Sequence, residues 1–237
     1  MNIFCINLDH RKDRWDFIMK QFLNIPEINI VRFSAIEHKY GRIGCALSHM
    51  EVVNKYMNDK EYLIVMEDDC LIKDGINFYN KLIKIILWLK ANNNEWDIFN
   101  GSPSFVNIST CNILDDKLNI IKYGIGGSAT FIIYNTTNPQ LWDKIKKYRT
   151  ELNLYVDNIN KGKLKIKSKG KISSSLVLDK YLNNNFICVT VVPYLTSHLT
   201  TYSNIEKKCK NYDDIFQKSE KILLDYKYNN SNISYDK

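Results

Sequence analysis

The sequence predicts an α/β protein in which a mainly parallel central sheet carries helices on both faces. Short apolar segments typical of buried strands alternate along the chain with longer segments of helical periodicity. The run Tyr62–Met66 is continuously apolar, as expected of a strand that is covered on both faces of a parallel sheet. The length of 237 residues suffices for one substantial domain.

The individual elements follow from these periodicities. The expected strands are residues 3–8, 28–33, 62–66, 97–99, 118–122, 129–134 and 186–192. The expected helices are residues 11–22, 45–56, 78–90, 139–148 and 173–182. Residues 1–205 are therefore predicted to form the domain, and residues 206–237 a helical and polar C-terminal tail with one amphipathic stretch at 215–224.

Composition excludes several classes of protein. A hydrophobic fraction of 45% and only 9 Gly and 4 Pro rule out disordered and fibrous chains. No CxxC pair is present, so a zinc site of the usual spacing is not expected. The longest apolar stretch, residues 82–89, contains Lys84 and is too short for an integral membrane segment. No signal peptide is recognisable, so the cytoplasm is the default expectation.

The net charge of +7 suits an anionic partner such as a nucleotide. Lysine-rich patches at 144–147 and 161–171 keep a nucleic-acid-binding or processing protein open as an alternative. A solvated lysine-rich surface explains the same patches, and no basic motif interleaved with aromatic residues is present. We therefore expect no nucleic-acid partner.

The most informative local feature is the acidic triplet Glu67-Asp68-Asp69, which directly follows the apolar run. Ligands of open α/β sheets gather beyond the carboxyl ends of strands, where this triplet is expected to lie. Three adjacent carboxylates repel one another and are costly to bury without a cation. A hard divalent ion held there could share its ligands with a substrate diphosphate. The alternative is a helix-capping loop that continues through Asp74 and Gly75.

Three motifs in order resemble glycosyltransferase family 25, which includes lipooligosaccharide glycosyltransferases and collagen hydroxylysine galactosyltransferases. They are Ile6–Arg14 (INLDHRKDR), Gly44–His49 (GCALSH) and Met66–Asp69 (MEDD). Weaker matches follow at Trp96-Asp97-Ile98, Gly126-Gly127-Ser128-Ala129, Asp179, Pro193, Ser203 and Ile205. The resemblance implies a GT-A-type, Rossmann-like fold and a UDP-sugar donor. It also implies a divalent metal, usually manganese, and inversion at the anomeric carbon. Galactose is the preferred donor sugar by this resemblance alone.

The resemblance also implies roles for residues around the donor. Asn7, Leu8, Arg11 and Arg14 are expected to bind the nucleotide, together with Ser48, Glu67 and Asp68. Surface ion pairs with Asp13 or Asp16 are the alternative for the two arginines. Asp69 is the first candidate metal ligand, with Asp68 and His198 as further ligands, although a lone histidine is more often structural. His49 is expected to cap or pack a helix near the nucleotide, with catalysis as the alternative.

Inversion calls for a base that deprotonates the acceptor hydroxyl, a task that suits a carboxylate. Asp179 is the candidate base and Asp97 the reserve, whereas an exposed helix position beside Lys180 is the alternative for Asp179. Gly126, Gly127 and Ser128 are expected to let the backbone approach the sugar. The expected acceptor is a collagen-like protein or a glycan, and a homodimer is kept open. A catalytically inactive UDP-sugar-binding module of the same fold is the alternative function.

Overall fold

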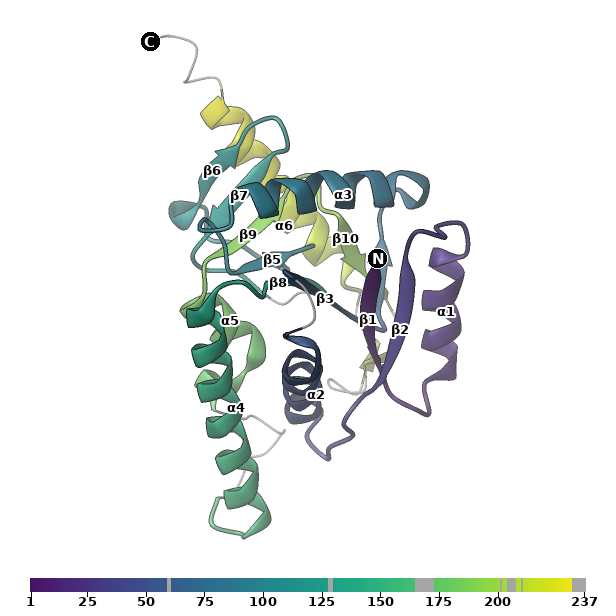
Figure 1. The fold of residues 1–237 in the computed structure, drawn as a ribbon, viewed down its shortest axis with the longest axis vertical. Coiled ribbons are helices and arrows are strands. Elements are labelled where there is room, and N and C mark those ends of the chain that lie inside the picture. The colour runs from purple at the N-terminus through teal and green to yellow at the C-terminus, as the bar shows by residue number, and fades with distance from the viewer. Residues whose placement is uncertain are drawn as a thin grey trace.

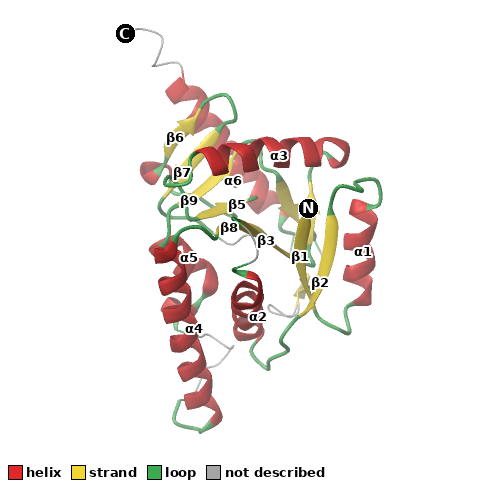
Figure 2. Ribbon diagram, viewed as in Figure 1, coloured by secondary structure: helices red, strands yellow, loops and turns green. Residues whose placement is uncertain are grey.

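The computed structural model describes residues 1–58, 61–127, 130–164, 173–200, 202–203, 208–209 and 211–231. Its centre is an eight-stranded sheet of order β2-β1-β3-β8-β5-β9-β7-β6, with helices on both faces (Figures 1 and 2). The predicted Rossmann-like α/β class is therefore confirmed.

The strands and helices have the following bounds. The sheet contains β1 (Asn2–Asn7), β2 (Asn29–Ser34), β3 (Tyr62–Glu67), β5 (Ile98–Asn100), β6 (Asn112–Asp115), β7 (Ile120–Tyr123), β8 (Phe131–Asn135) and β9 (Cys188–Val191). Two small antiparallel pairs are formed by β4 (Cys70–Ile72) with β10 (Thr196–His198) and by β11 (Tyr202–Ser203) with β12 (Lys208–Cys209). The helices are α1 (Lys12–Phe22), α2 (Gly41–Tyr56), α3 (Gly75–Ala91), α4 (Pro139–Asn160), α5 (Leu178–Asn185) and α6 (Asp213–Ser231).

Strand directions place the end of β3 beside the end of β1. Strands β2, β1 and β3 are mutually parallel, and β5 is parallel to β9. Strand β8 is antiparallel to both β3 and β5, and β7 is antiparallel to β9 and β6. Only β7 and β8 thus run against the other strands of this described sheet. The carboxyl ends of β1, β3, β5 and β9 consequently share one edge, where ligands of such sheets bind.

Alternating side chains along each strand build two cores. Phe4 and Ile6 of β1 face α2, α4 and α5, whereas Ile3 and Cys5 face α1 and α3. In Figure 1, α3 lies above the sheet and α2 and α4 lie below it. Both faces of β3 are buried in the same way, which explains its continuous apolar run. The sheet therefore supplies a rigid, two-sided scaffold for the residues at its edge.

Several predicted boundaries differ from the structure. Helix α2 begins four residues earlier than predicted, and α4 continues twelve residues further, to Asn160. The predicted helix at 173–182 is a 3-10 turn at Ser174–Leu176 followed by α5. Strands β4, β6 and β10 were not predicted, because three or four residues give too little periodicity to recognise.

Helix α6 packs on the body of the protein, although its residues fall in the segment predicted as a tail. Phe216 and Leu223 are fully buried, and Glu220 accepts hydrogen bonds from Lys73 Nζ at 2.6 Å and from the Tyr194 amide at 2.6 Å. None of the helices that the structure describes combines the length and apolar character that a membrane span needs.

Gly44, in the first turn of α2, lets the preceding loop lie against the helix. A Cβ atom there would come within 2.6 Å of the Ile36 carbonyl oxygen and 3.3 Å of the His38 amide nitrogen. Ser48, one turn later, accepts a hydrogen bond from the Ile36 amide at 2.8 Å and donates one to the Gly44 carbonyl at 2.7 Å. The loop thus contacts α2 at Gly44, by close packing, and at Ser48, by a hydrogen bond.

We expect Gly44→Ala to lower the free energy of unfolding by about 1–3 kcal/mol, since the added methyl group meets backbone atoms that cannot move independently. Gly75→Ala is the matched control, because a Cβ at Gly75 meets nothing within 4 Å. Chemical denaturation of both variants measures the difference. Equal stability of the two variants would show that the loop does not press on α2.

Candidate active site

The acidic triplet lies at the sheet edge predicted for it. Glu67 is the last residue of β3, and Asp68 and Asp69 form the turn that leads into β4. Both aspartates are less than a tenth exposed. Glu67 is level with Ile6 in the neighbouring β1, so residues that follow β1 lie next to the triplet.

Asp68 is held by two residues that come from the opening motif. Arg14 Nη1 in α1 donates to Asp68 Oδ1 at 2.7 Å and to Asp69 Oδ2 at 3.0 Å. Asn7 Nδ2, at the end of β1, donates to Asp68 Oδ2 at 2.8 Å. The guanidinium therefore neutralises part of the charge that the sequence argument assigned wholly to a metal ion. Arg14 forms this buried ion pair instead of the surface pair considered for it.

Asp69 faces His198 because β4 pairs with β10. His198 is level with Cys70 in that pair, and the Leu199 amide donates to the Asp69 carbonyl at 2.7 Å. The distance from His198 Nε2 to Asp69 Oδ2 is 3.4 Å. The other carboxylate oxygen, Oδ1, is buried and accepts no hydrogen bond from any described residue. Burial raises the pKa of Asp69 to about 6; the charge of His198 opposes this rise and that of Glu67 adds to it.

The surroundings of His198 orient its ring. Nδ1 lies 2.8 Å from the Leu199 carbonyl oxygen, which can only accept, so Nδ1 carries the hydrogen. The ring stacks on Tyr212, with centroids 4.1 Å apart, and Phe216 lies on the same side at 5.9 Å. Nε2 therefore faces an oxygen of Asp69. The two atoms can share a proton or hold a cation between them.

Glu67 receives two side chains from successive turns of α2. His49 Nε2 lies 3.1 Å from Glu67 Oε1, and Cys45 Sγ lies 3.7 Å from the same oxygen. Burial alone would raise the pKa of Glu67, but the hydrogen bond and charge of His49 outweigh it and lower that pKa from its ordinary value. Glu67 is thus ionised at neutral pH, and about a quarter of its side chain is exposed.

Asp179, in the first turn of α5, belongs to the same electrostatic environment. Burial raises its pKa to about 6, the charge of Glu67 raises it further, and His49 and Arg42 oppose the rise. The side chain is partly buried, not exposed as the alternative interpretation assumed. A carboxyl group with this pKa is mostly ionised at neutral pH and is a stronger base than an ordinary aspartate.

The other predicted site residues are Leu8, Arg11, Ser48 and Asp97. The Leu8 carbonyl accepts from the Arg11 amide at 2.9 Å, and the Arg11 guanidinium is paired with Asp13 through two hydrogen bonds. Both hydrogen bonds of the buried Ser48 are internal to the loop and α2. Asp97 is not brought to the site. It lies at the amino end of β5, and its oxygens accept from Asn138 Nδ2 and the Ile187 amide.

The two glycines of the small-residue segment accommodate the protein's own chain. A Cβ at Gly127 would lie 2.0 Å from Ser104 Oγ, and one at Gly126 would lie 2.4 Å from the Tyr123 ring. Ser128, expected to approach the sugar with them, lies outside the described residues.

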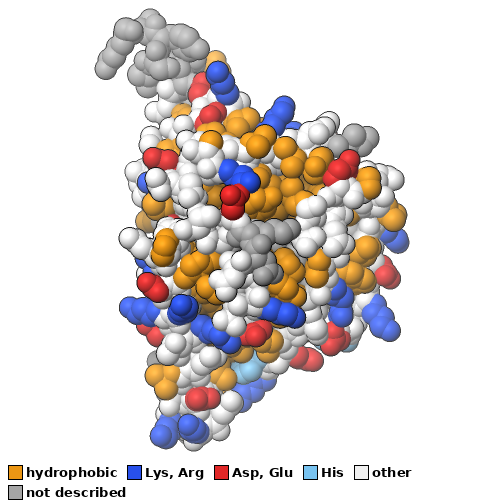
Figure 3. Space-filling model, in the orientation of Figure 1, with side chains coloured by type: hydrophobic (Ala, Val, Ile, Leu, Met, Phe, Trp, Pro, Cys, Tyr) orange, Lys and Arg blue, Asp and Glu red, His pale blue; other side chains and the backbone are white. Residues whose placement is uncertain are grey.

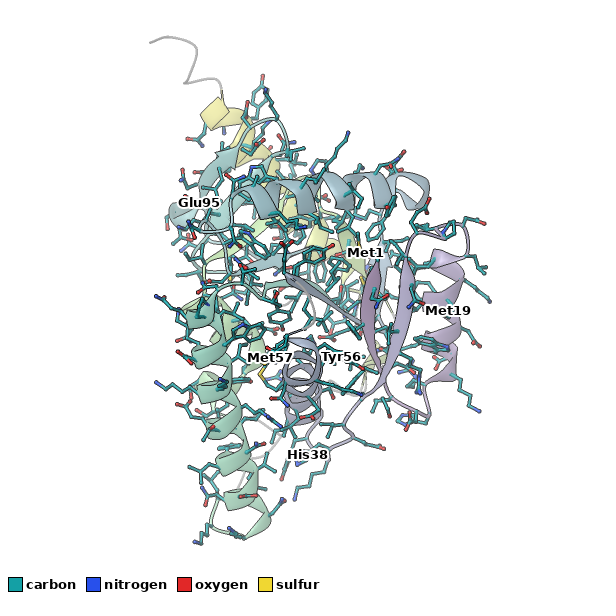
Figure 4. The ribbon with its side chains drawn as sticks, viewed as in Figure 1. Met1, Met19, His38, Tyr56, Met57 and Glu95 are labelled. Atoms are coloured by element: carbon teal, nitrogen blue, oxygen red, sulfur yellow. The ribbon has the colours of Figure 1, made fainter. Side chains whose placement is uncertain are left out.

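Two hollows lined by described residues lie at the opposite edge of the sheet. One is lined by Met1, Phe4 and Tyr56, and Met1 and Tyr56 are marked in Figure 4. Its neighbour contains Glu61 and Lys90, which pair with each other. Apolar side chains gather in the middle of the face that Figure 3 shows. These hollows carry no buried charged group, so the chemistry points to the acidic edge instead.

Sequence reasoning missed the contacts of Cys45 and His49 with Glu67 and of Tyr212 with His198. The spacing of Cys45 and His49 is a usable signal, because residues four apart lie on one face of a helix. Tyr212 gave no comparable signal, since its contact depends on the unpredicted pairing of β4 and β10.

We expect Asp179→Asn to stabilise the protein at neutral pH. The unfolded chain releases the Asp179 proton near pH 3.8, whereas the folded protein retains it to about pH 6. Protonation of Asp179 therefore contributes to the stability of the folded state. The contribution is complete below pH 3.8 and is lost as the pH rises through about 6. The gain in the variant should be at most about 3 kcal/mol at pH 7.5 and vanish near pH 4. Thermal melts across this range measure it, and a gain independent of pH would contradict the assignment.

Comparison with known proteins identifies a family for the chain. The family model described as glycosyltransferase family 25 (LPS biosynthesis protein) matches residues 39–160, just over half of the chain. The match contains the Gly44–His49 motif and the acidic triplet. No curated protein matches the chain. On the strength of the family match, the chain belongs to glycosyltransferase family 25 and is a glycosyltransferase by family.

Proposed function

We propose that the protein is an inverting, metal-dependent glycosyltransferase that transfers a sugar, with galactose preferred, from a UDP-sugar to a hydroxyl group. The observation that carries the proposal is the facing pair of potential ligand atoms, Asp69 Oδ2 and His198 Nε2, 3.4 Å apart at the sheet edge where ligands of such folds bind. The buried Asp69 Oδ1, without a partner among the described residues, adds a third acceptor atom.

These acceptor atoms fit a divalent cation such as Mn²⁺, which takes carboxylate and imidazole ligands. Asp69 and His198 would hold the ion, and the hydrogen bond from His198 Nδ1 to a backbone carbonyl is the support that ligating histidines usually have. Bound there, the ion would neutralise charge on the departing diphosphate. Asp68 is a weaker candidate ligand, because both its oxygens already accept hydrogen bonds.

The start of α1 supports the proposed donor position. The helix begins at Lys12, shortly after β1 ends at Asn7, and its Arg14 side chain contacts the triplet, so a helix N-terminus lies near this sheet edge. Arg11, at the N-cap, would add a guanidinium to a diphosphate bound there, in exchange for its bonds with Asp13. Asn7 orients Asp68 from the end of β1.

Asp179 is the residue to which we assign the base. In the proposed step the acceptor oxygen forms a bond to the anomeric carbon as the bond from that carbon to the diphosphate oxygen breaks. The acceptor proton passes to Asp179, and UDP leaves. Asp97 is not assigned this role, because it lies at the other edge with both oxygens engaged.

The acceptor that we favour is a glycan of the lipooligosaccharide kind, because the family description names LPS biosynthesis. A hydroxylysine of a collagen-like protein is the second candidate acceptor, from the resemblance of the motifs. A release assay with each acceptor class distinguishes them.

We expect Asp69→Asn to lower Mn²⁺-dependent UDP release by at least about 100-fold, as does the loss of other groups that stabilise transition-state charge. A panel of UDP-sugars, with and without Mn²⁺, supplies the substrates. Asp157→Asn, an exposed carboxylate on α4, is the control and should release UDP like the wild type. Full activity of the Asp69 variant would remove the metal assignment. Binding of UDP-sugars by the wild type without any release would favour the inactive module.

We expect Tyr212→Ala to raise the Mn²⁺ concentration for half-maximal UDP release by about 10-fold, since the stacked ring that holds His198 is lost. Tyr212→Phe keeps the ring and should leave this concentration unchanged. A Mn²⁺ titration of both variants at saturating donor gives the comparison. An unchanged Ala variant would show that the Tyr212 ring does not support the site.

A further inference from the structure

Cys45, His49 and Glu67 form a compact group of ligand atoms that the proposed function does not use as a metal site. The thiol sulfur, one imidazole nitrogen and one carboxylate oxygen all lie within 4.8 Å of one another. Among the described residues, this is the one group of three or more such side chains. The Asp69–His198 pair does not belong to it.

The fold brings these three atoms together from two elements. Cys45 and His49 are one turn apart on α2, so both point from the same face of the helix. Glu67 ends β3, and its Oε1 lies 3.1 Å from His49 Nε2 and 3.7 Å from Cys45 Sγ. His49 is 1% exposed, whereas Glu67 and Cys45 are partly exposed and give an ion a way in. The group is therefore pre-formed and reachable.

We propose that Cys45, His49 and Glu67 form a second cation site, which takes a borderline-soft divalent ion such as Zn²⁺ in preference to Mn²⁺. A thiolate, an imidazole and a carboxylate are all ordinary zinc ligands, and a thiolate disfavours hard ions. Three protein ligands also leave a fourth position open for water or another ligand, as in zinc sites that exchange their contents.

Binding changes the protonation of the group in a defined way. The thiol of Cys45 releases its proton to solvent as sulfur coordinates the ion. His49 now donates from Nε2 to Glu67, so this hydrogen must leave Nε2 before that nitrogen can become a ligand. A protonated ring releases it to solvent, and a neutral ring then carries its one hydrogen on Nδ1. Nδ1 is buried and has no hydrogen-bond partner among the described residues.

The missing partner of Nδ1 sets the strength of the site. Ligating histidines usually donate their second N–H, and loss of that support lowers metal affinity by about 10- to 100-fold. The site therefore binds its ion reversibly and more weakly than a structural zinc site. A bound ion would also replace the hydrogen bonds that Cys45 and His49 make to Glu67. Occupancy of this site therefore changes the contacts of Glu67, which lies at the same sheet edge as Asp69.

Cobalt(II) is the probe, because Co²⁺ replaces Zn²⁺ in such sites and coordination by a thiolate gives a charge-transfer absorption in the near ultraviolet. We expect this band when the full chain is titrated with Co²⁺, and we expect Zn²⁺, but not an equal excess of Mn²⁺, to remove it. Cys45→Ser should abolish the band, and His49→Gln or Glu67→Gln should require at least about 10-fold more Co²⁺.

Two control variants make the result specific. Cys111→Ser changes a free thiol that does not belong to the group, and Asp69→Asn changes the proposed diphosphate-side ligand; both should keep the band. Absence of the band in folded wild-type protein, or its persistence in Cys45→Ser, would overturn the second site. The readout does not depend on UDP release, so the proposed function and this site can fail independently.

Discussion

The turn Asp68-Asp69 is the constraint around which the rest of the site is arranged. Its carboxylates are buried at the end of β3, so each requires partners brought from elsewhere in the chain. Arg14 arrives from α1 and His198 from β10, which are far apart in the sequence. The same sheet edge thus joins the opening motif to the closing segment, and the two cores beneath it fix their separation.

The negative charge of the three carboxylates at this edge is neutralised only in part by basic side chains of the protein, and to a different extent for each carboxylate. Arg14 contacts Asp68 and Asp69, and His49 contacts Glu67, but Asp69 Oδ1 receives no hydrogen bond from any described residue. Asp179 gains base strength because burial and Glu67 both oppose its ionisation. The carboxylates of the triplet and that of Asp179 are therefore coupled through one electrostatic environment.

The fold class and the position of the triplet could be predicted from the sequence, because long periodic segments and an apolar run identify buried elements. The triplet's partners could not be predicted in the same way. Arg14 was expected to bind the nucleotide, and its pairing with Asp68 was not predicted, because a contact between residues so far apart in the sequence gives no local signal. Asp97 and Asp179 were both candidate bases, yet strand direction places Asp97 at the other edge. Contacts that depend on β4 and β10 had no local signal.

Helix α6 supports His198 from a position later in the chain than every strand of the central sheet. During vectorial synthesis, the sheet can therefore assemble on the ribosome before the histidine acquires its stacked neighbours. A nascent chain whose strands β1 to β9 have left the ribosome contains the acidic triplet. It still lacks Tyr212 and Phe216, the aromatic rings that contact His198. The site around His198 would then be completed late in synthesis, after the central sheet has already folded.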